Sequence, residues 1–135
     1  MIASLLFGCF FACGEEESPQ TCGAAIAIND QRYDAVKSDQ FSILSAILNE
    51  SCLSVTINSS GCDGDRWGHD VVASTAIAES WPVQRYIKIE FSNSEECDAV
   101  ITKEVMFDLS TLQLSEYQEM IINLEGFEDQ ISFTY

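Results

Sequence analysis

Residues 60–70, SGCDGDRWGHD, hold the densest group of polar side chains in the sequence. Asp63, Asp65 and Asp70 could supply oxygen ligands to Ca²⁺, and the spacing of the first two matches the start of an EF-hand loop. Trp67, however, occupies the third ligand place, and no Glu follows at the required distance. The three aspartates are therefore weak calcium candidates, and a Gly-rich turn held by a disulfide is the expected structure.

His69 is the single histidine of the chain, so a Ser-His-Asp hydrolase would have to use it as the general base. No G-x-S-x-G pattern, which would place a nucleophilic serine on a sharp turn, occurs in the sequence. A zinc site lacks support as well, because no C-x-x-C pair is present to join the one histidine. The sequence therefore predicts no catalytic residue and no cofactor.

A second unusual stretch is AESWPVQRY at residues 78–86. Trp81, Gln84 and Arg85 are the candidate binding loop, because exposed tryptophan and arginine side chains are enriched where partners bind. The competing interpretation is a proline-broken loop between two strands, in which Trp81 is half buried.

The net charge is −16, from 22 Asp and Glu against 6 Lys and Arg. Such a charge repels nucleic-acid phosphates and anionic lipid headgroups, which argues against nucleic acid as a partner. It is typical of a solvated surface, or of a protein that meets basic partners or cations. The length of 135 residues fits one domain with its own hydrophobic core.

Residues 1–12, MIASLLFGCFFA, are apolar but too few to span a bilayer as a helix, which needs roughly 20 residues. They predict a secretory signal, with a buried strand as the alternative. Because no Lys or Arg precedes the run, the natural start lies upstream of Met1 or the signal is unusually short. FFAC resembles a bacterial lipobox, so Cys13 is the predicted lipidation site and Cys9 the alternative. Residues 13–21 would then be the lipidated cysteine and an acidic tether.

The remaining four cysteines lie in the predicted folded domain, residues 22–135, and an even number in an exported chain predicts two disulfides. Cys52 and Cys62 bracket one predicted strand, about 30 Å long when extended, and so cannot bond to each other. This leaves Cys22–Cys52 with Cys62–Cys97, or Cys22–Cys62 with Cys52–Cys97. We prefer the first, because Cys62 and Cys97 each follow a strand end, where two loops can meet.

Apolar and polar residues alternate in five short runs, at 53–57, 86–91, 105–109, 120–124 and 131–135. Turn residues separate the runs, so the chain is predicted to be all-β, an immunoglobulin-like antiparallel β-sandwich of about seven to nine short strands. Three further segments are expected to be a kinked strand or short helix (41–48), a strand followed by a loop or else a helix (66–79), and one helical turn (110–118).

From Cys52 onward the sequence resembles a group of small uncharacterised lipoproteins of marine and gut Bacteroidetes. The elements that carry the resemblance are S-G-C at residues 60–62 followed by Trp67, A-E-S-x-P-x-Q at 78–84, and C-x-A-x-x-T-K at 97–103. The resemblance implies secretion and supports the Cys62–Cys97 pairing. It implies no activity, because none is assigned to that group.

The sequence thus predicts a lipoprotein of the bacterial outer membrane, periplasmic or surface-exposed, that acts as a non-enzymatic binding or envelope-associated module. The expected partners are the membrane, through the lipid anchor, and an unidentified protein or glycan. The alternatives are a secreted hydrolase or hydrolase inhibitor, and a calcium-stabilised adhesion-type module.

Overall fold

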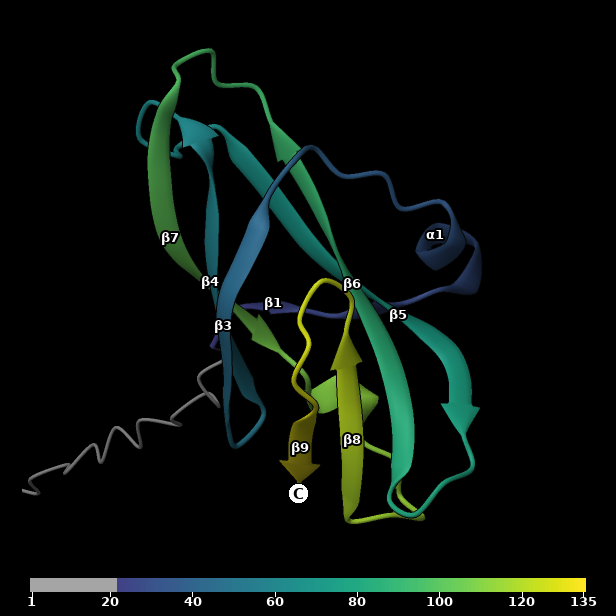
Figure 1. Cartoon of the computed structure of the whole chain (residues 1–135). Coiled ribbons are helices and arrows are strands. Elements are labelled where there is room, and N and C mark those ends of the chain that lie inside the picture. Colours follow the sequence, from purple (N-terminus) through teal and green to yellow (C-terminus); the bar gives the residue numbers. More distant parts are fainter. Residues whose placement is uncertain (1–21) are drawn as a thin grey trace, which may run out of the picture.

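Alternating burial along the strands builds two β-sheets that face each other across a common core (Figure 1). This computed structural model describes residues 22–135. The predicted signal, the predicted lipidation site Cys13 and the acidic tether lie outside the described residues. No helix within the described part is long and apolar enough to cross a membrane.

The first sheet has the strand order β1 (Ala24–Ala25), β7 (Ala99–Asp108), β4 (Cys52–Gly61), β3 (Ser42–Asn49). The second has the order β2 (Ala27–Ile28), β5 (Trp67–Ala78), β6 (Val83–Asn93), β8 (Glu119–Leu124), β9 (Ile131–Thr134). The helical elements of the described part are α1 (Asp30–Asp34) and the 3₁₀ turn η1 (Ser110–Leu112).

The prediction of an all-β sandwich is confirmed, with nine strands in residues 22–135. The expectation that the sheets are wholly antiparallel is wrong, because β1 pairs with β7, β2 with β5, and β6 with β8 in parallel. Alternation along a strand reports which face is buried and carries no information on the direction of the neighbouring strand.

The inner faces of the two sheets supply the core. Leu53, Val55 and Ile57 of β4 are completely buried, as the period-two pattern predicts. They meet aromatic and aliphatic residues of the facing sheet, including Ile87, Phe91 and Phe133.

Two ambiguous segments are strands. Residues 41–48 lie largely in β3, whose pairing with β4 shifts between Ile43 and Ser45, as a kinked strand requires. Residues 67–78 form the strand β5 and not a helix. Val71 faces the core between the sheets. Val72 points to the opposite face and is buried there, on the side where α1 contacts β5. The single helical turn expected within 110–118 is η1.

Candidate functional site

Both disulfides of the preferred pairing are present in the structure. Cys62–Cys97 joins the β4–β5 loop to the β6–β7 loop, with the two Cα atoms 4.9 Å apart. Cys22–Cys52 joins the first described residue to the start of β4, with a Cα–Cα distance of 5.7 Å. The first disulfide therefore fixes a loop end of the sandwich, and the second fixes the place where the chain enters the fold.

The β4–β5 loop is folded around the carboxylate of Glu95. Glu95 Oε2 accepts the backbone N–H of Arg66 at 2.9 Å, and Oε1 accepts those of Cys62, Asp63 and Gly64 at 2.6, 3.2 and 2.9 Å. These four donors lower the pKa of Glu95 from its ordinary 4.5 to about 2, because they stabilise the ionised form. The backbone N–H groups of the polar stretch at residues 60–70 thus bind the carboxylate of Glu95.

Two glycines permit this close approach of backbone to carboxylate. Gly64 has a φ of +78°, a conformation that side chains other than glycine rarely adopt. A Cβ at Gly61 would collide with Oε1 of Glu95. The S-G-C-D-G pattern therefore reflects a backbone requirement of the loop.

We expect Glu95→Gln to lower the melting temperature by several degrees at pH 7, whereas Glu96→Gln, at the exposed neighbouring position, changes it little. Because the pKa of Glu95 is lower in the folded state, its contribution is fully present above about pH 4.5 and is lost as the pH falls through about 2. Thermal unfolding followed by circular dichroism from pH 7 to pH 2 measures the difference between the two variants. A difference that grows on acidification would contradict the assignment.

The calcium candidates are held by other partners. Asp63 accepts the backbone N–H of Asp65 at 2.9 Å, Asp65 pairs with Lys103 at 3.3 Å, and Asp70 pairs with Arg32 at 3.1 Å. The described part of the chain contains no group of three or more His, Cys, Asp or Glu side chains placed to hold a metal ion. The geometry gives the calcium-stabilised alternative no support.

His69 lies exposed on β5 with its ring edge-on to Phe107, 5.8 Å between centroids. Among the described residues, no hydrogen bond joins its side chain to a serine or a carboxylate. The arrangement that a Ser-His-Asp hydrolase requires is therefore not assembled around it.

Arg85, expected in the binding loop, is only 4% exposed and points into the sandwich, which corrects that expectation. Residues 74–76 of β5 have no partner on β6, so the carbonyl of Ser74 lacks a ladder donor. Arg85 donates to that carbonyl at 3.3 Å and to the carbonyl of Leu112 at 3.0 Å. Its side chain thus satisfies two buried backbone acceptors inside the fold.

The same interruption of β5 is tied to α1. The hydroxyl and the backbone N–H of Thr75 and the hydroxyl of Ser74 all donate to the carboxylate of Asp30, and they lower the pKa of that group. Asp30 and Arg85 therefore both bond to residues 74 and 75, where β5 has no partner on β6.

We expect Arg85→Met to destabilise the fold by about 2 kcal/mol, because two buried carbonyls lose their donor while the cost of burying the charge is removed. The matched control is Arg66→Met at an exposed position, which should change the unfolding free energy by less than about 0.5 kcal/mol. Urea denaturation measures both variants. Equal stability of Arg85→Met and wild type would show that the two carbonyls do not depend on the arginine.

The β5–β6 loop presents the most exposed of the large apolar side chains in the described structure, Trp81 at 88%. The half-buried alternative for this residue does not hold. Gln84 is partly buried and accepts a hydrogen bond from Asn123 at 3.0 Å, so it braces the base of the loop. Of the three candidate residues, Trp81 alone is fully presented to solvent.

Two adjoining hollows border this loop. One, of about 480 Å³, lies between Trp81–Pro82 and residues 115–119. The other, of about 280 Å³, lies between Ile77, Glu79 and residues 114–117. Residues 115–117 line both. We call this surface, made of Ile77, Glu79, Trp81, Pro82 and residues 114–119, the Trp81 end.

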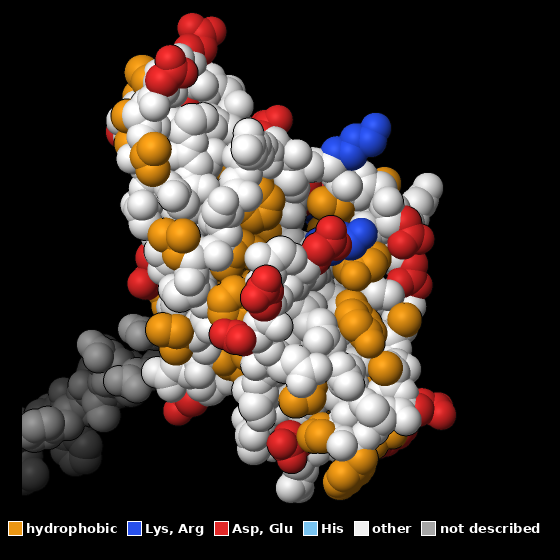
Figure 2. Space-filling view, in the orientation of Figure 1, with side chains coloured by type: hydrophobic (Ala, Val, Ile, Leu, Met, Phe, Trp, Pro, Cys, Tyr) orange, Lys and Arg blue, Asp and Glu red, His pale blue; other side chains and the backbone are white. Residues whose placement is uncertain are grey.

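The Trp81 end is acidic as well as aromatic. Glu79, Glu116 and Glu119 are exposed, and none makes a side-chain hydrogen bond or ion pair within the described residues. In Figure 1 the β5–β6 loop and the start of β8 lie at the bottom of the molecule. There Figure 2 shows hydrophobic side chains beside acidic ones, whereas Lys and Arg side chains gather at the upper right of this face.

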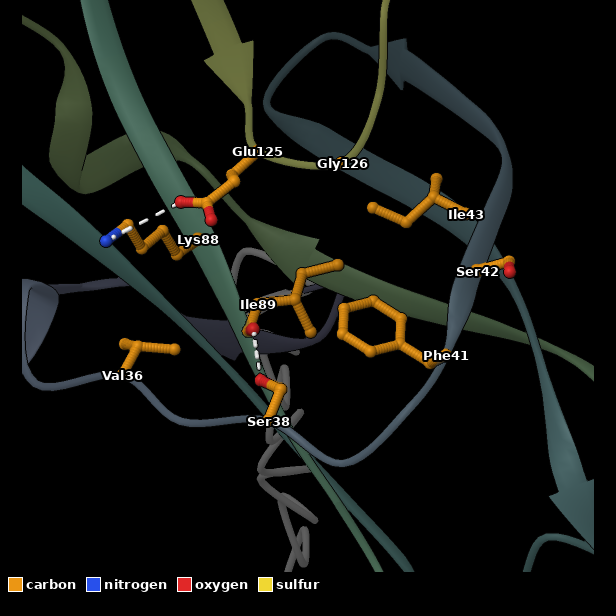
Figure 3. A pocket seen from close by; sticks show the side chains of 9 residues that line it. All are labelled: Val36, Ser38, Phe41, Ser42, Ile43, Lys88, Ile89, Glu125 and Gly126. Atoms are coloured by element: carbon orange, nitrogen blue, oxygen red, sulfur yellow. Dashed lines mark hydrogen bonds and ion pairs between the residues drawn. The ribbon is translucent and has the colours of Figure 1, made fainter.

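A third hollow, of about 370 Å³, opens beside the start of β3 (Figure 3). Phe41, Ile43 and Ile89 supply apolar walls, and Lys88 pairs with Glu125 across it at 3.5 Å. The hydroxyl of Ser38 donates to the carbonyl of Ile89 at 3.0 Å and accepts the backbone N–H of Phe91 at 2.9 Å, which ties the loop before β3 to β6. With its charges paired and no base beside the serine, this hollow offers no catalytic arrangement.

The similarity of this chain to known proteins is one of fold alone. No protein-family model matches the chain, and no curated protein does. Solved structures of similar fold include a NigD-like immunity protein from Bacteroides caccae, with a TM-score of 0.60 and 14% identity over 85% of this chain and 65% of that one. A DUF1344 protein of unknown function from Bacteroides vulgatus gives a TM-score of 0.56 and 15% identity over 84% of this chain and 56% of that one.

A toxin-related protein from Parabacteroides distasonis gives a TM-score of 0.53 and 12% identity, over 84% of this chain and 60% of that one. The chain therefore spans less than two thirds of the length of each of these three structures. The similarity agrees with a β-rich module of a type found in Bacteroides and Parabacteroides.

Proposed function

We propose that this chain is a lipid-anchored envelope protein whose domain is a non-enzymatic binding module, and that the Trp81 end is its binding surface. The observation that carries the proposal is the 88% exposure of Trp81 on a loop bordered by two hollows. Burying such a side chain against a partner contributes about 3 kcal/mol, so an exposed tryptophan is a ready anchor for binding.

Hydrogen bonds hold the β5–β6 loop in one conformation, which favours a role in binding. Within the loop, Ser80 donates to the carbonyl of Pro82 at 2.6 Å and accepts from Gln84 at 3.1 Å, and Gln84 accepts from Asn123 at 3.0 Å. A surface held in place before binding loses less conformational entropy when the partner arrives. Trp81 is therefore exposed on a loop whose conformation is held by hydrogen bonds.

A non-enzymatic role is supported by the kinds of protein that share the fold; within residues 22–135, no catalytic arrangement is assembled around His69. One of these is described as a NigD-like immunity protein and another as a protein of unknown function. An immunity role for this chain would require a surface that binds another protein, and the Trp81 end has the exposed aromatic anchor for it. The acidic surface argues against nucleic acid as the partner.

Anchoring through Cys13 is the second part of the proposal. Two disulfides among four cysteines favour an oxidising compartment. Cys22–Cys52 secures the domain directly after the proposed acidic tether. In the bacterial host, full-length Cys13→Ser should leave the membrane fraction, while Cys9→Ser should remain in it. If Cys13→Ser stays attached to the membrane, the lipidation site must be another residue.

The binding surface is tested by isolating tagged full-length variants from envelope extracts under identical conditions. We expect Trp81→Ala to lose at least tenfold of a stoichiometric partner, without a change in melting temperature, because the side chain has almost no intramolecular contact. Val100→Ala, which removes another exposed apolar side chain (74%), should retain the partner. Full retention of the partner by Trp81→Ala would refute the proposed surface.

A further inference from the structure

We propose that the ligand of the Trp81 end is a cationic segment, a short stretch of a basic protein partner that carries Arg or Lys side chains. This inference rests on the proposed function, since it names the chemistry of the ligand at the same surface. It follows from three observations: the aromatic rings, the unpaired carboxylates and the charge of the whole molecule.

The rings provide the first component. Trp81 offers most of its indole to solvent, and Tyr117 lines both hollows beside it. The face of an indole attracts ammonium and guanidinium groups more strongly than the face of any other side chain. A cation lying over Trp81 would also cover apolar surface that is otherwise in contact with water.

The carboxylates provide the second component. Glu116 borders both hollows, Glu119 borders the larger and Glu79 the smaller. Elsewhere in the described chain many carboxylates are already engaged, as Asp65 is with Lys103 and Glu125 with Lys88. Three unpaired negative charges beside exposed rings are therefore free to pair with a cation from outside.

Elsewhere in the protein, an aromatic ring and a carboxylate already bind a cationic side chain together. Lys88 Nζ lies 4.2 Å from the centroid of the Tyr33 ring and 3.5 Å from Oε2 of Glu125, and it donates to the backbone carbonyl of Tyr33 at 3.2 Å. An aromatic face and a carboxylate thus hold a cation at α1. The Trp81 end has the same two components without the cation.

The overall charge provides the third component. Only six Lys and Arg accompany 22 Asp and Glu, and none of the six lines the two hollows of the Trp81 end. Arg85, the nearest along the sequence, is buried and bonded to carbonyls. A net charge of −16 accelerates the approach of a basic partner and disfavours an acidic one.

A capped peptide of sequence Arg-Gly-Arg-Gly tests the inference, with its citrulline counterpart as the neutral control of the same shape. The readout is quenching of Trp81 fluorescence in full-length protein, with buried Trp67 (9% exposed) as the internal reference. We expect the arginine peptide to bind at least tenfold more tightly than the citrulline peptide. Equal binding of the two peptides would overturn the inference.

Matched charge variants separate local recognition from general attraction to an acidic protein. Glu116→Gln with Glu119→Gln, and Glu104→Gln with Glu128→Gln, each remove two negative charges from exposed positions. The first pair should weaken binding of the arginine peptide at least fivefold and the second less than twofold. Equal weakening would identify non-specific attraction. Quenching of Trp81 by a neutral oligosaccharide, with none by the arginine peptide, would assign the surface to a glycan.

These results are distinct from a failure of the proposed function. If Trp81→Ala loses the envelope partner while the arginine peptide does not bind, the surface is correct and the class of ligand is wrong. If Trp81→Ala retains the partner, the proposed surface is wrong whatever the peptide does.

Discussion

Deletion of residues 131–135 is expected to abolish folding of the domain. The segment contains β9, which pairs with β8 and buries Ile131 and Phe133 in the core. Loss of the Phe133 side chain alone costs about 3–5 kcal/mol and that of Ile131 about 2–5 kcal/mol, against a total stability of roughly 5–15 kcal/mol for a domain. The hydroxyl of Tyr135 also bonds the backbone N–H and carbonyl of Leu114 at 3.0 Å each.

Circular dichroism and one-dimensional NMR of the deleted protein measure the outcome. Phe133→Leu keeps the test quantitative if the deletion yields no soluble protein, and should cost about 1–2 kcal/mol in urea denaturation. Thr134→Ala, at an exposed position of the same strand, is the control with little expected effect. A cooperative unfolding transition in the deleted protein would show that β9 is dispensable.

Removal of the Cys62–Cys97 disulfide by double substitution with alanine is expected to cost about 4 kcal/mol. The estimate follows from the loop-closure entropy of the 35 residues that separate the two cysteines. The disulfide and the carboxylate of Glu95 order the same β4–β5 loop, so their effects should not add. Urea denaturation of the double-alanine variant, of Glu95→Gln and of the combination measures both terms.

Peptide mapping under non-reducing conditions supplies the covalent control for this prediction. It should recover a fragment that joins Cys62 to Cys97 and another that joins Cys22 to Cys52. A fragment that joins Cys52 to Cys97 would contradict the pairing. Simple addition of the two energetic effects would show that disulfide and carboxylate act on separate parts of the loop.

The strand positions could be predicted from the sequence because burial on one face imposes a period of two. This is clear at Leu53, Val55 and Ile57, which are all completely buried. The parallel pairing of β6 with β8 could not be predicted, because it depends on where η1 returns the chain. The five-residue helix α1 was missed because it is shorter than two turns, although Asn29 caps it by accepting the N–H of Arg32.

The candidate site could be predicted only in part. The sequence named Trp81 as a binding candidate on the condition that it is exposed; the structure shows the exposure, and the binding role stays a prediction. The inward direction of Arg85 was signalled by its place in the alternation Val83, Arg85, Ile87, but its role depends on the interruption of β5 after Ala73, which no local pattern reveals. The contribution of residues 114–119 was missed, because they are more than 30 positions away in sequence and meet Trp81 only in the fold.

Position-resolved photo-crosslinking in living cells tests directly whether the Trp81 end is the binding surface. A photoreactive amino acid is placed in the full-length protein at Ser115, which is exposed and lines both hollows, or at Val100 as the control. We expect a discrete covalent adduct with another protein from position 115, lost when Trp81→Ala is added, and none from position 100. An adduct from position 100 with none from position 115 would contradict this expectation.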